Sequence, residues 1–191
     1  MLKDLIMKNR SYRRFYQEQA IDMATLRELV DLARLSPCGA NLQPLKYILV
    51  CDRKSNKKIF PLLSWAAYLK DWPGPPEGER PAAYIIMLQD KAIRPQPGCD
   101  HGIAAMSIML GAVEKGWGGC IIATIKKDEL RVLYGIPEQH EIMLVLALGK
   151  PKENVKIEPI GANGDVGYWR DEQGVHHVPK RPLKEIILGG K

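Results

Sequence analysis

HGIAAMSIMLGAVEK, which spans residues 101–115, decides the fold, because it is the strongest helical pattern in the chain. Its apolar residues cover nearly all sides of a helix, and Gly116 follows at the position where helices commonly end. A helix of this composition has no evident side for solvent. We therefore expect residues 101–115 to form the central buried helix of the protein.

Four runs of apolar and β-branched residues lie on both sides of this helix and predict short strands. They are Lys46–Cys51, Ala82–Leu88, Cys120–Ile125 and Ile142–Leu148. Strands and helices alternate irregularly along the chain, so the order is a mixture of α and β.

Three further helices are predicted from the spacing of apolar residues and from residues typical of helix ends. The first is short and carries Leu2, Leu5 and Ile6 on one face. The second follows Asp22, a suitable capping residue, and stops before Pro37. The third covers Lys127–Tyr134 and ends at Gly135.

The remaining segments differ in composition from this frame. A stretch rich in Trp and Pro occupies residues 64–81, and the chain becomes polar after Pro151. Turn residues 171–174 separate two short runs, which predicts a β-hairpin arm at about 160–178. A short strand or helix is expected at 183–188, and residues 1–191 show no second hydrophobic core, which indicates one domain.

Composition limits the class of protein. The chain has 191 residues, 46% of them hydrophobic, and a formal net charge of +6. No apolar stretch approaches the roughly 18 residues of a membrane span, and the charged N-terminal residues are unlike a signal peptide, so we expect a cytoplasmic protein without a membrane partner. The basic residues are scattered among acids, and this pattern argues against a nucleic-acid partner.

Several chemistries have no matching motif. The sequence lacks a phosphate-binding P-loop, a nucleophile elbow and an H-E-x-x-H pair, and residues 116–119 lack the G-x-G-x-x-G spacing of a Rossmann unit. Four widely spaced cysteines form no C-x-x-C and are expected to be buried free thiols. His176 and His177 are adjacent and would face opposite sides of a strand. We expect no metal site.

Arg10, Ser11 and Arg13 follow directly on the first helix and form the more informative polar cluster. Two guanidinium groups and a hydroxyl within four residues suit a phosphate monoester. A solvated basic helix end, where cations meet the negative pole of the dipole, explains the same residues.

A second polar cluster is the loop SPCGANLQP, residues 36–44. Asn41 and Gln43 each present a donor and an acceptor, which can read the carbonyl and imide edge of a planar heterocycle. A turn whose amides only satisfy its own backbone is an equally good interpretation.

Together these stretches resemble the nitroreductase family. RSYRRF at residues 10–15 and the loop SPCGANLQP are similar to the family's paired signatures, R-S-x-R-x-F and P-S-x-x-N-x-Q-P-W. Two longer stretches, residues 100–122 and 134–153, fall in the family's order, and HVPKRPLKEIIL at 177–188 resembles its basic tail. Each motif is weak alone, but the resemblance runs across nearly the whole chain.

Three positions depart from the family pattern. Cys38 stands where Ser is common, Leu45 where Trp is common, and Ala123 where Gly is often found. These changes leave phosphate capture untouched and alter the expected contacts at the flavin edge.

The resemblance implies an α+β nitroreductase-like fold, with a mostly antiparallel central sheet flanked by helices in an intertwined homodimer. It implies two non-covalent FMN sites at the dimer interface. One subunit would hold the phosphate and ribityl groups with Arg10, Ser11, Arg13, Lys180 and Arg181. Backbone groups near Ile122, Ala123 and Thr124 would face flavin N5. The other subunit would approach the flavin with Pro37, Cys38, Asn41 and Gln43.

The implied activity is ping-pong hydride transfer from NAD(P)H through flavin N5 to a small-molecule acceptor such as a nitroaromatic or quinone. No side chain is expected to act as a nucleophile or general acid. The alternative is a non-catalytic flavin-binding sensor or carrier. Trp65, Tyr68 and Trp72 are expected to pack as core rather than stack on an acceptor, and the arm is expected either to anchor Trp169 on a partner subunit or to wall the acceptor pocket.

Overall fold

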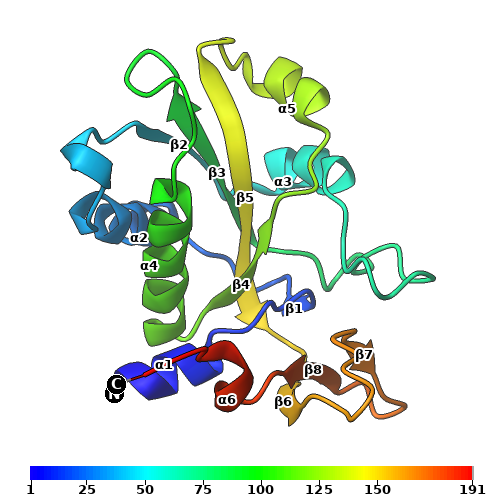
Figure 1. The fold of residues 1–191 in the computed structure, drawn as a ribbon. Helices are drawn as coiled ribbons and strands as arrows, with labels where there is room; N and C mark the ends of the chain where they lie inside the picture. Colours follow the sequence, from blue (N-terminus) through cyan, green and yellow to red (C-terminus); the bar gives the residue numbers. More distant parts are fainter. Residues whose placement is uncertain (191) are drawn as a thin grey trace.

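The computed structural model describes residues 1–190, and Figure 1 shows its helices gathered around one central sheet. The first half of the chain contains α1 (Leu2–Lys8), β1 (Phe15–Tyr16), α2 (Met23–Leu35), η1 (Gly39–Asn41), β2 (Leu45–Val50), α3 (Arg53–Ile59), η2 (Phe60–Leu62) and β3 (Ala83–Asp90). The second half contains α4 (Asp100–Glu114), β4 (Gly118–Ile122), α5 (Lys127–Tyr134), β5 (His140–Pro151), β6 (Val155–Pro159), β7 (Trp169–Arg170), β8 (His176–Lys180) and α6 (Leu183–Ile186).

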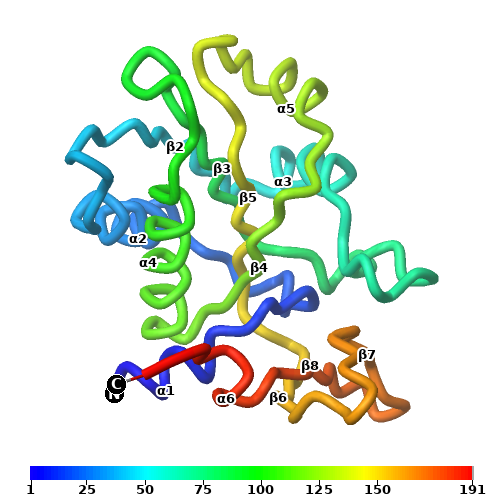
Figure 2. Tube along the Cα trace, in the orientation of Figure 1, coloured from blue at the N-terminus to red at the C-terminus, as the bar shows by residue number. Residues whose placement is uncertain are grey.

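The central sheet has five strands, and every pairing in it is antiparallel. Its path runs β1-β5-β3-β2, and β4 pairs with the second half of β5. β5 is the long strand that joins the others, and Figure 2 shows it crossing the length of the molecule. The predicted α+β class with a mostly antiparallel sheet is confirmed.

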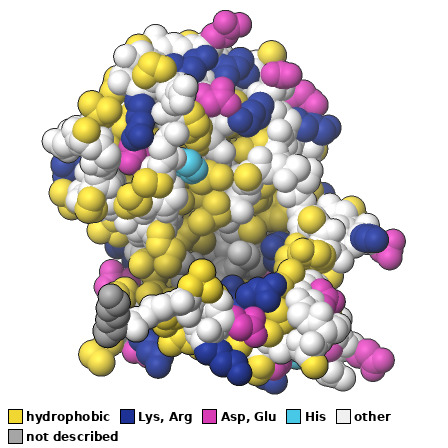
Figure 3. Space-filling model, in the orientation of Figure 1, with side chains coloured by type: hydrophobic (Ala, Val, Ile, Leu, Met, Phe, Trp, Pro, Cys, Tyr) yellow, Lys and Arg dark blue, Asp and Glu magenta, His cyan; other side chains and the backbone are white. Residues whose placement is uncertain are grey.

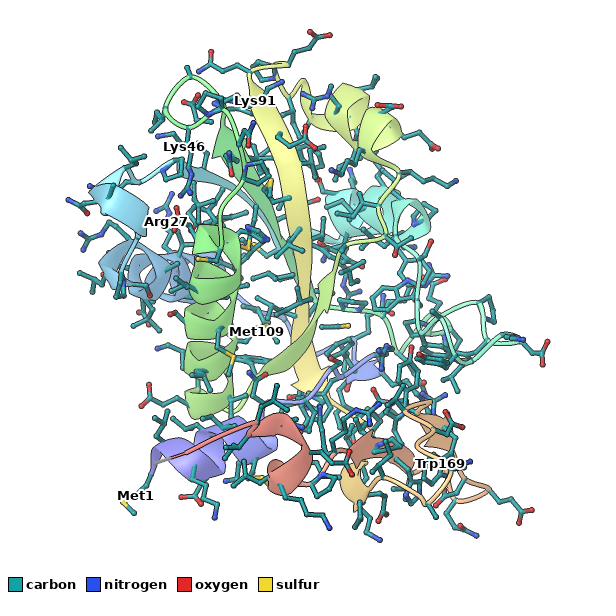
Figure 4. All side chains as sticks on the ribbon, in the orientation of Figure 1. Met1, Arg27, Lys46, Lys91, Met109 and Trp169 are labelled. Carbon is teal, nitrogen blue, oxygen red and sulfur yellow. The ribbon has the colours of Figure 1, made fainter. Side chains whose placement is uncertain are left out.

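Helices cover both faces of this sheet. Alternate residues of β3 divide between two cores: Ile85 and Met87 pack with α2 and α4, while Tyr84 and Ile86 pack with α3, η2 and α5. All eight residues of β3 are buried, as expected for a strand covered on both sides. Met109 on α4 is 2% exposed and points to the first core (Figure 4).

Helix α4 is only partly buried within one chain. Its position is as predicted, but Gly102, Ile103 and Met106 are exposed on one side, with Ile103 and Met106 at 37% and 38%. A single chain therefore does not bury this helix completely. Figure 3 shows apolar side chains gathered on this face of the molecule, around a hollow.

Other predicted elements are confirmed with shifted ends. Asp22 caps α2 by accepting from Thr25 N at 2.7 Å, and Gly135 ends α5 in the left-handed conformation at φ 58°. The strand predicted for Cys120–Ile125 starts and stops earlier, at Gly118–Ile122, because Gly118 and Gly119 pair with β5 despite their low strand propensity. β1, α3 and β6 were not predicted.

The predicted arm is a small second sheet. β7 and β8 form the expected antiparallel hairpin, and β6 adds parallel to β8, which makes the order β6-β8-β7. The expected burial of all four free thiols is wrong for three of them, since only Cys120 is fully buried. In residues 1–190 no helix is long and apolar enough to cross a membrane.

Candidate functional site

One cavity, at the end of β4, contains several of the predicted flavin-contacting residues. It has a volume of about 240 Å³ and is lined by Arg13, residues 64–67, residues 120–124 and Tyr168. Ile122, Ala123 and Thr124 thus lie at the same cavity as Arg13. The chain leaves the central sheet after Ile122, and Thr124 O then accepts from Ser64 N at 3.0 Å on the opposite wall of the cavity.

Pairing with β4 fixes the N-terminal cluster at this cavity. Ser11 bridges Gly119, and Tyr12 N donates to Gly119 O at 2.9 Å. Gly119 is required here, because a Cβ at this position would lie 2.4 Å from Ala147 O. Burial raises the pKa of the Cys120 thiol on the next residue of β4.

Arg10 begins the cluster and is half-buried. Its Nη2 donates to Ile6 O at 2.8 Å, while its Nε is buried and has no hydrogen-bond partner within residues 1–190. An unpaired guanidinium N–H is a ready donor for an anion.

Arg13 is held from three directions. Its Nη1 donates to Ser11 O at 3.2 Å and lies 3.3 Å from His176 Nε2, and its guanidinium lies 4.8 Å from the centre of the Tyr168 ring. The arm therefore fixes the orientation of a cation at the cavity.

The two histidines of β8 face opposite sides, as predicted. His176 is 1% exposed, and burial, reinforced by Arg13 and Arg170, lowers its pKa to about 4. His177 lies between Asp171 and Glu158, each at 2.9 Å, and stacks on Trp169. Those carboxylates, Asp171 first, raise the pKa of His177.

Glu153 anchors the arm to the core and was not singled out from the sequence. Its side chain is fully buried, accepts from the backbone N–H groups of Arg13 and Arg14, and pairs with Arg170 at 3.0 Å. Nearby, the hydrogen bond from the Arg14 guanidinium, together with Lys152, lowers the pKa of Glu79 to about 2. Because Glu153 only follows a strand in the sequence, nothing local reveals these distant partners.

The Trp- and Pro-rich stretch meets the arm beside this cavity. Tyr68 packs edge-on against Tyr168 at 4.9 Å, and the Arg170 guanidinium lies 4.8 Å from the centre of the Trp72 ring. Trp65 is buried, as expected of a core residue. Tyr68 is 57% exposed, so its assignment to the core is wrong.

Pro37, Cys38 and Gln43 line a different cavity, of about 220 Å³, beside α2 and the start of α4. Buried Asp100 holds this loop: it accepts from Gly39 N at 2.9 Å and from Arg94 Nη1 at 2.9 Å, and the Cys38 thiol lies 3.5 Å away. These contacts, the Gly39 amide first, lower the pKa of Asp100. Neither Asp100 nor Arg94 was singled out from the sequence.

The backbone of this loop is unusual. Ala40, Asn41 and Gln43 all have positive φ, between 50° and 54°. Residues without glycine's freedom adopt this region at a cost, and such strain gathers at functional sites. Gln43 Nε2 donates to Asn41 O at 3.3 Å, so one amide does partly satisfy its own loop.

Lys180 and Arg181 line a third, open groove of about 710 Å³ between the end of β6 and α6. Arg181 is exposed and lies 3.3 Å from Glu185. The predicted residues thus fall into three groups within one chain: the cluster at the end of β4, the loop around Asn41, and the basic pair after β8.

Comparison with known proteins gives consistent matches. A protein-family model described as "Nitroreductase family" matches residues 6–150. A protein of Methanothermobacter thermautotrophicus, whose name gives NADH dehydrogenase/NAD(P)H nitroreductase as a provisional activity, is 28% identical over 155 residues, covering 78% of this chain and 76% of that protein.

Solved structures agree on the fold. A nitroreductase family protein of Clostridium difficile 630 has a TM-score of 0.68 at 21% identity and covers 98% of this chain and 97% of its own. A protein named as an FMN-dependent nitroreductase, from Clostridium difficile R20291, has a TM-score of 0.64 at 20% identity over 78% of this chain and 87% of its own.

Proposed function

The chain belongs to the nitroreductase family, and from this premise we propose that it is an FMN-dependent oxidoreductase that takes electrons from NAD(P)H and passes them to an organic acceptor. The observation that carries the proposal is the cavity at the end of β4, where a fixed cation, Arg13, lies beside residues 122–124, at the point where the chain leaves the sheet. The FMN-dependent relative and the nicotinamide-dependent relative support the same assignment.

The residues at this cavity fit FMN. The buried, unpartnered Nε of Arg10, the hydroxyl of Ser11 and the guanidinium of Arg13 form a donor set suited to a phosphate or the polar edge of a ring. We propose that Arg10, Ser11 and Arg13 bind FMN non-covalently, and that the backbone of Ile122, Ala123 and Thr124 lies along the flavin. Lys180 and Arg181 complete the phosphate site in this proposal.

Bound FMN would supply the two-electron chemistry, in which a hydride enters at N5 from NAD(P)H and leaves to the acceptor in a ping-pong cycle. The chain's own residues bind and orient. Arg13 places positive charge at the cavity, where charge developing on the reduced cofactor is stabilised. We assign no side chain as nucleophile or general acid. Tyr168, which lines the cavity and packs against Tyr68, presents aromatic surface to a flat acceptor such as a nitroaromatic or quinone.

We also propose a homodimer, in which residues 1–191 act as one domain per subunit. The exposed apolar side of α4, at Ile103 and Met106, continues onto neighbouring α1, where Ile6 and Met7 are 40% and 51% exposed. A second copy of the chain would cover this surface. It would also explain why Pro37, Cys38 and Gln43 line a separate cavity, since together with Asn41 they would complete the flavin site of the partner.

The proposal is tested by the visible spectrum of the purified protein and its response to NADH and NADPH. Flavin absorption bands that bleach anaerobically with either nucleotide, and return when a quinone is added, are expected. A flavin spectrum that neither nucleotide bleaches would instead establish the alternative, a non-catalytic flavin-binding sensor or carrier. A colourless protein that binds no added FMN would overturn both.

A further inference from the structure

The cavity of about 220 Å³ beside α2 is large enough for an organic molecule of its own. Most of its wall is apolar, and this part is formed by Ala33, Pro37, Pro44, Leu45 and Ala104. An apolar cavity of roughly 150 Å³ holds one benzene ring. The cavity therefore has room for one six-membered ring with a small substituent, and less room than the three fused rings of a flavin require.

Tyr47 on β2 places a hydroxyl at this cavity. The side chain is half-buried, and its hydroxyl has no hydrogen-bond partner within residues 1–190. Unlike the sealed hydroxyl of Tyr84, it retains accessible surface, so a ligand can reach it. Burial and, second, the nearby Cys38 raise the pKa of Tyr47 to about 12, so the hydroxyl stays protonated at neutral pH. A ligand oxygen would give this group the partner that the chain does not supply.

Asp100 and Cys38, which also line the cavity, already have partners in the chain. The Asp100 carboxylate accepts from Gly39 N and from Arg94 Nη1, each at 2.9 Å. The Cys38 thiol lies 3.5 Å from Asp100, and its sulfur accepts from Gln43 N at 3.1 Å. These two side chains hold the loop together, and their bonding leaves the Tyr47 hydroxyl as the group that a ligand would engage.

The charged residues at this cavity do not favour a charged ligand. Arg34 is paired with Asp31 at 2.6 Å. Lys46 lies between Leu45 and Tyr47 on β2, and both of these pack on the α2 and α4 side of the sheet, so alternation points the lysine to the opposite face. An ion that entered the cavity would leave water without gaining a free counter-ion, which is costly. The ligand that fits is therefore neutral.

Size, walls and the hydroxyl together define one class of ligand. We propose that this cavity binds a neutral one-ring phenol, with its ring between the apolar walls and its oxygen at the Tyr47 hydroxyl. A phenol suits this group because each of the two hydroxyls can both donate and accept. The cavity is separate from the one at the end of β4, and the inference does not depend on flavin chemistry.

Two probes that share a ring and differ by the hydroxyl test the proposal: 4-fluorophenol and fluorobenzene. Each is titrated by ¹⁹F NMR at pH 7 into protein saturated with FMN, so that the proposed flavin sites are filled. Tyr47→Phe is expected to weaken 4-fluorophenol binding about fivefold, the scale of one hydrogen bond, and to leave fluorobenzene binding unchanged. The anion 4-fluorobenzoate should bind at least tenfold more weakly than 4-fluorophenol.

Substitutions in the wall locate the probe. Leu45→Trp fills the cavity and should abolish binding of both neutral probes. Leu35→Trp is the matched control, because Leu35 is 64% exposed at the end of α2 and does not line the cavity, and this variant should bind both probes normally. If Leu45→Trp does not fold, Leu45→Phe, a smaller change at the same position, decides the location by the same measurement.

Each contrary result overturns a defined part of the proposal. If the wild type does not bind 4-fluorophenol, there is no such site. Unchanged 4-fluorophenol affinity in Tyr47→Phe removes the hydrogen bond and with it the phenol class, and equal affinity for 4-fluorobenzoate removes the requirement for a neutral ligand. Full binding in the Leu45 variants places the probe elsewhere. Binding that is seen only without FMN would mean that the flavin of a partner subunit occupies this cavity.

Discussion

Arg13 and His176 lie side by side, with 3.3 Å between Arg13 Nη1 and His176 Nε2, although 163 positions separate them in the sequence. Arg13 can donate only to an unprotonated ring nitrogen, so the contact requires neutral His176. The arm and the N-terminal cluster are thus joined by a bond that depends on protonation. Arg13, the cation that we propose binds the flavin, is therefore oriented by His176, a residue of the arm.

Stability is expected to fall as the pH drops from 7 to 4 because of His176. Its pKa is about 4 in the folded protein and 6.5 in an unfolded chain, so the unfolded state takes up the proton first. At pH 5 the loss from this residue is about 2 kcal/mol. Urea unfolding at pH 7 and 5 measures it, and His176→Gln should have a shallower pH dependence than the wild type. An unchanged slope in that variant would contradict the assignment.

His177 is the matched control because its pKa shifts the other way. Its pKa is raised by Asp171 and Glu158, so its contribution to stability is complete below pH 6.5 and is lost as the pH rises through the raised value. Histidine NMR signals should therefore show two residues titrating on opposite sides of the ordinary value. His177→Gln should remove only the one that titrates at higher pH.

Arg10→Ala and Arg181→Ala are each expected to weaken FMN binding by about 1.5 to 3 kcal/mol, the scale of a charge-assisted hydrogen bond. Fluorescence titration of the apoprotein with FMN measures the loss. Arg27→Ala, an exposed arginine on α2 far from the cavity at the end of β4 (Figure 4), is the control and should bind FMN normally. Full flavin occupancy after dialysis in both test variants would refute the phosphate assignment.

Asp100→Ala is expected to destabilise the protein by about 2 kcal/mol, because it leaves the Gly39 N–H and the Arg94 guanidinium without their acceptor. Urea unfolding measures this. Asp31→Ala removes an exposed pair with Arg34 at 2.6 Å and should cost less than about 0.5 kcal/mol. Equal effects of the two substitutions would show that Asp100 does not hold the loop.

Met106→Glu is expected to convert the proposed dimer to monomer and to lower FMN affinity at the same time, because a carboxylate on the exposed side of α4 cannot be buried against a second copy. Analytical ultracentrifugation with absorbance at the flavin band measures both. Val132→Glu on α5, at 83% exposed, should alter neither. A wild-type protein that is monomeric and retains FMN would contradict the proposal that two subunits share each flavin site.

The sequence predicts those parts of the fold that local chemistry specifies. Asp22 and Gly135 act within one helical turn, and the buried run of β3 is recognisable wherever it lies in the chain. β1 has two residues and β6 pairs with a strand about twenty positions away, so neither has a local signal. The incomplete burial of α4 is likewise a property of what surrounds the helix.

The residues of the candidate site also fall into two groups, those that local sequence predicts and those that only the structure reveals. Arg10, Ser11 and Arg13 lie within one short motif, and the pairing of Ser11 with Gly119 of β4 brings Arg13 to the cavity that Ile122–Thr124 line. Glu153 and Asp100 support the site through partners distant in the sequence, and their burial cannot be predicted without those partners. A resemblance can indicate candidate ligand-contacting residues, but the residues that support them are found only in the structure.

Deleting residues 164–174 and rejoining the chain tests the role of the arm. The deletion removes Tyr168, which lines the cavity, and Arg170, which pairs with Glu153, together with Trp169, which is 45% exposed and stacks on His177. Since Tyr168 lines the cavity and contacts Tyr68, we expect retained flavin with a changed preference among quinone and nitroaromatic acceptors, measured as the ratio of their kcat/KM values. Loss of dimer and flavin together would instead support anchoring on a partner subunit through Trp169.

Two single substitutions separate these roles without shortening the chain. Tyr168→Ala should change the acceptor ratio several-fold while the protein stays dimeric, because it removes the aromatic face at the cavity and one side of the Arg13 contact. Trp169→Ala should leave the ratio unchanged, since that ring lies on the opposite face of the arm against His177. Both roles of the arm would be refuted if the deletion of residues 164–174 changed neither the acceptor preference, nor the oligomeric state, nor the flavin content.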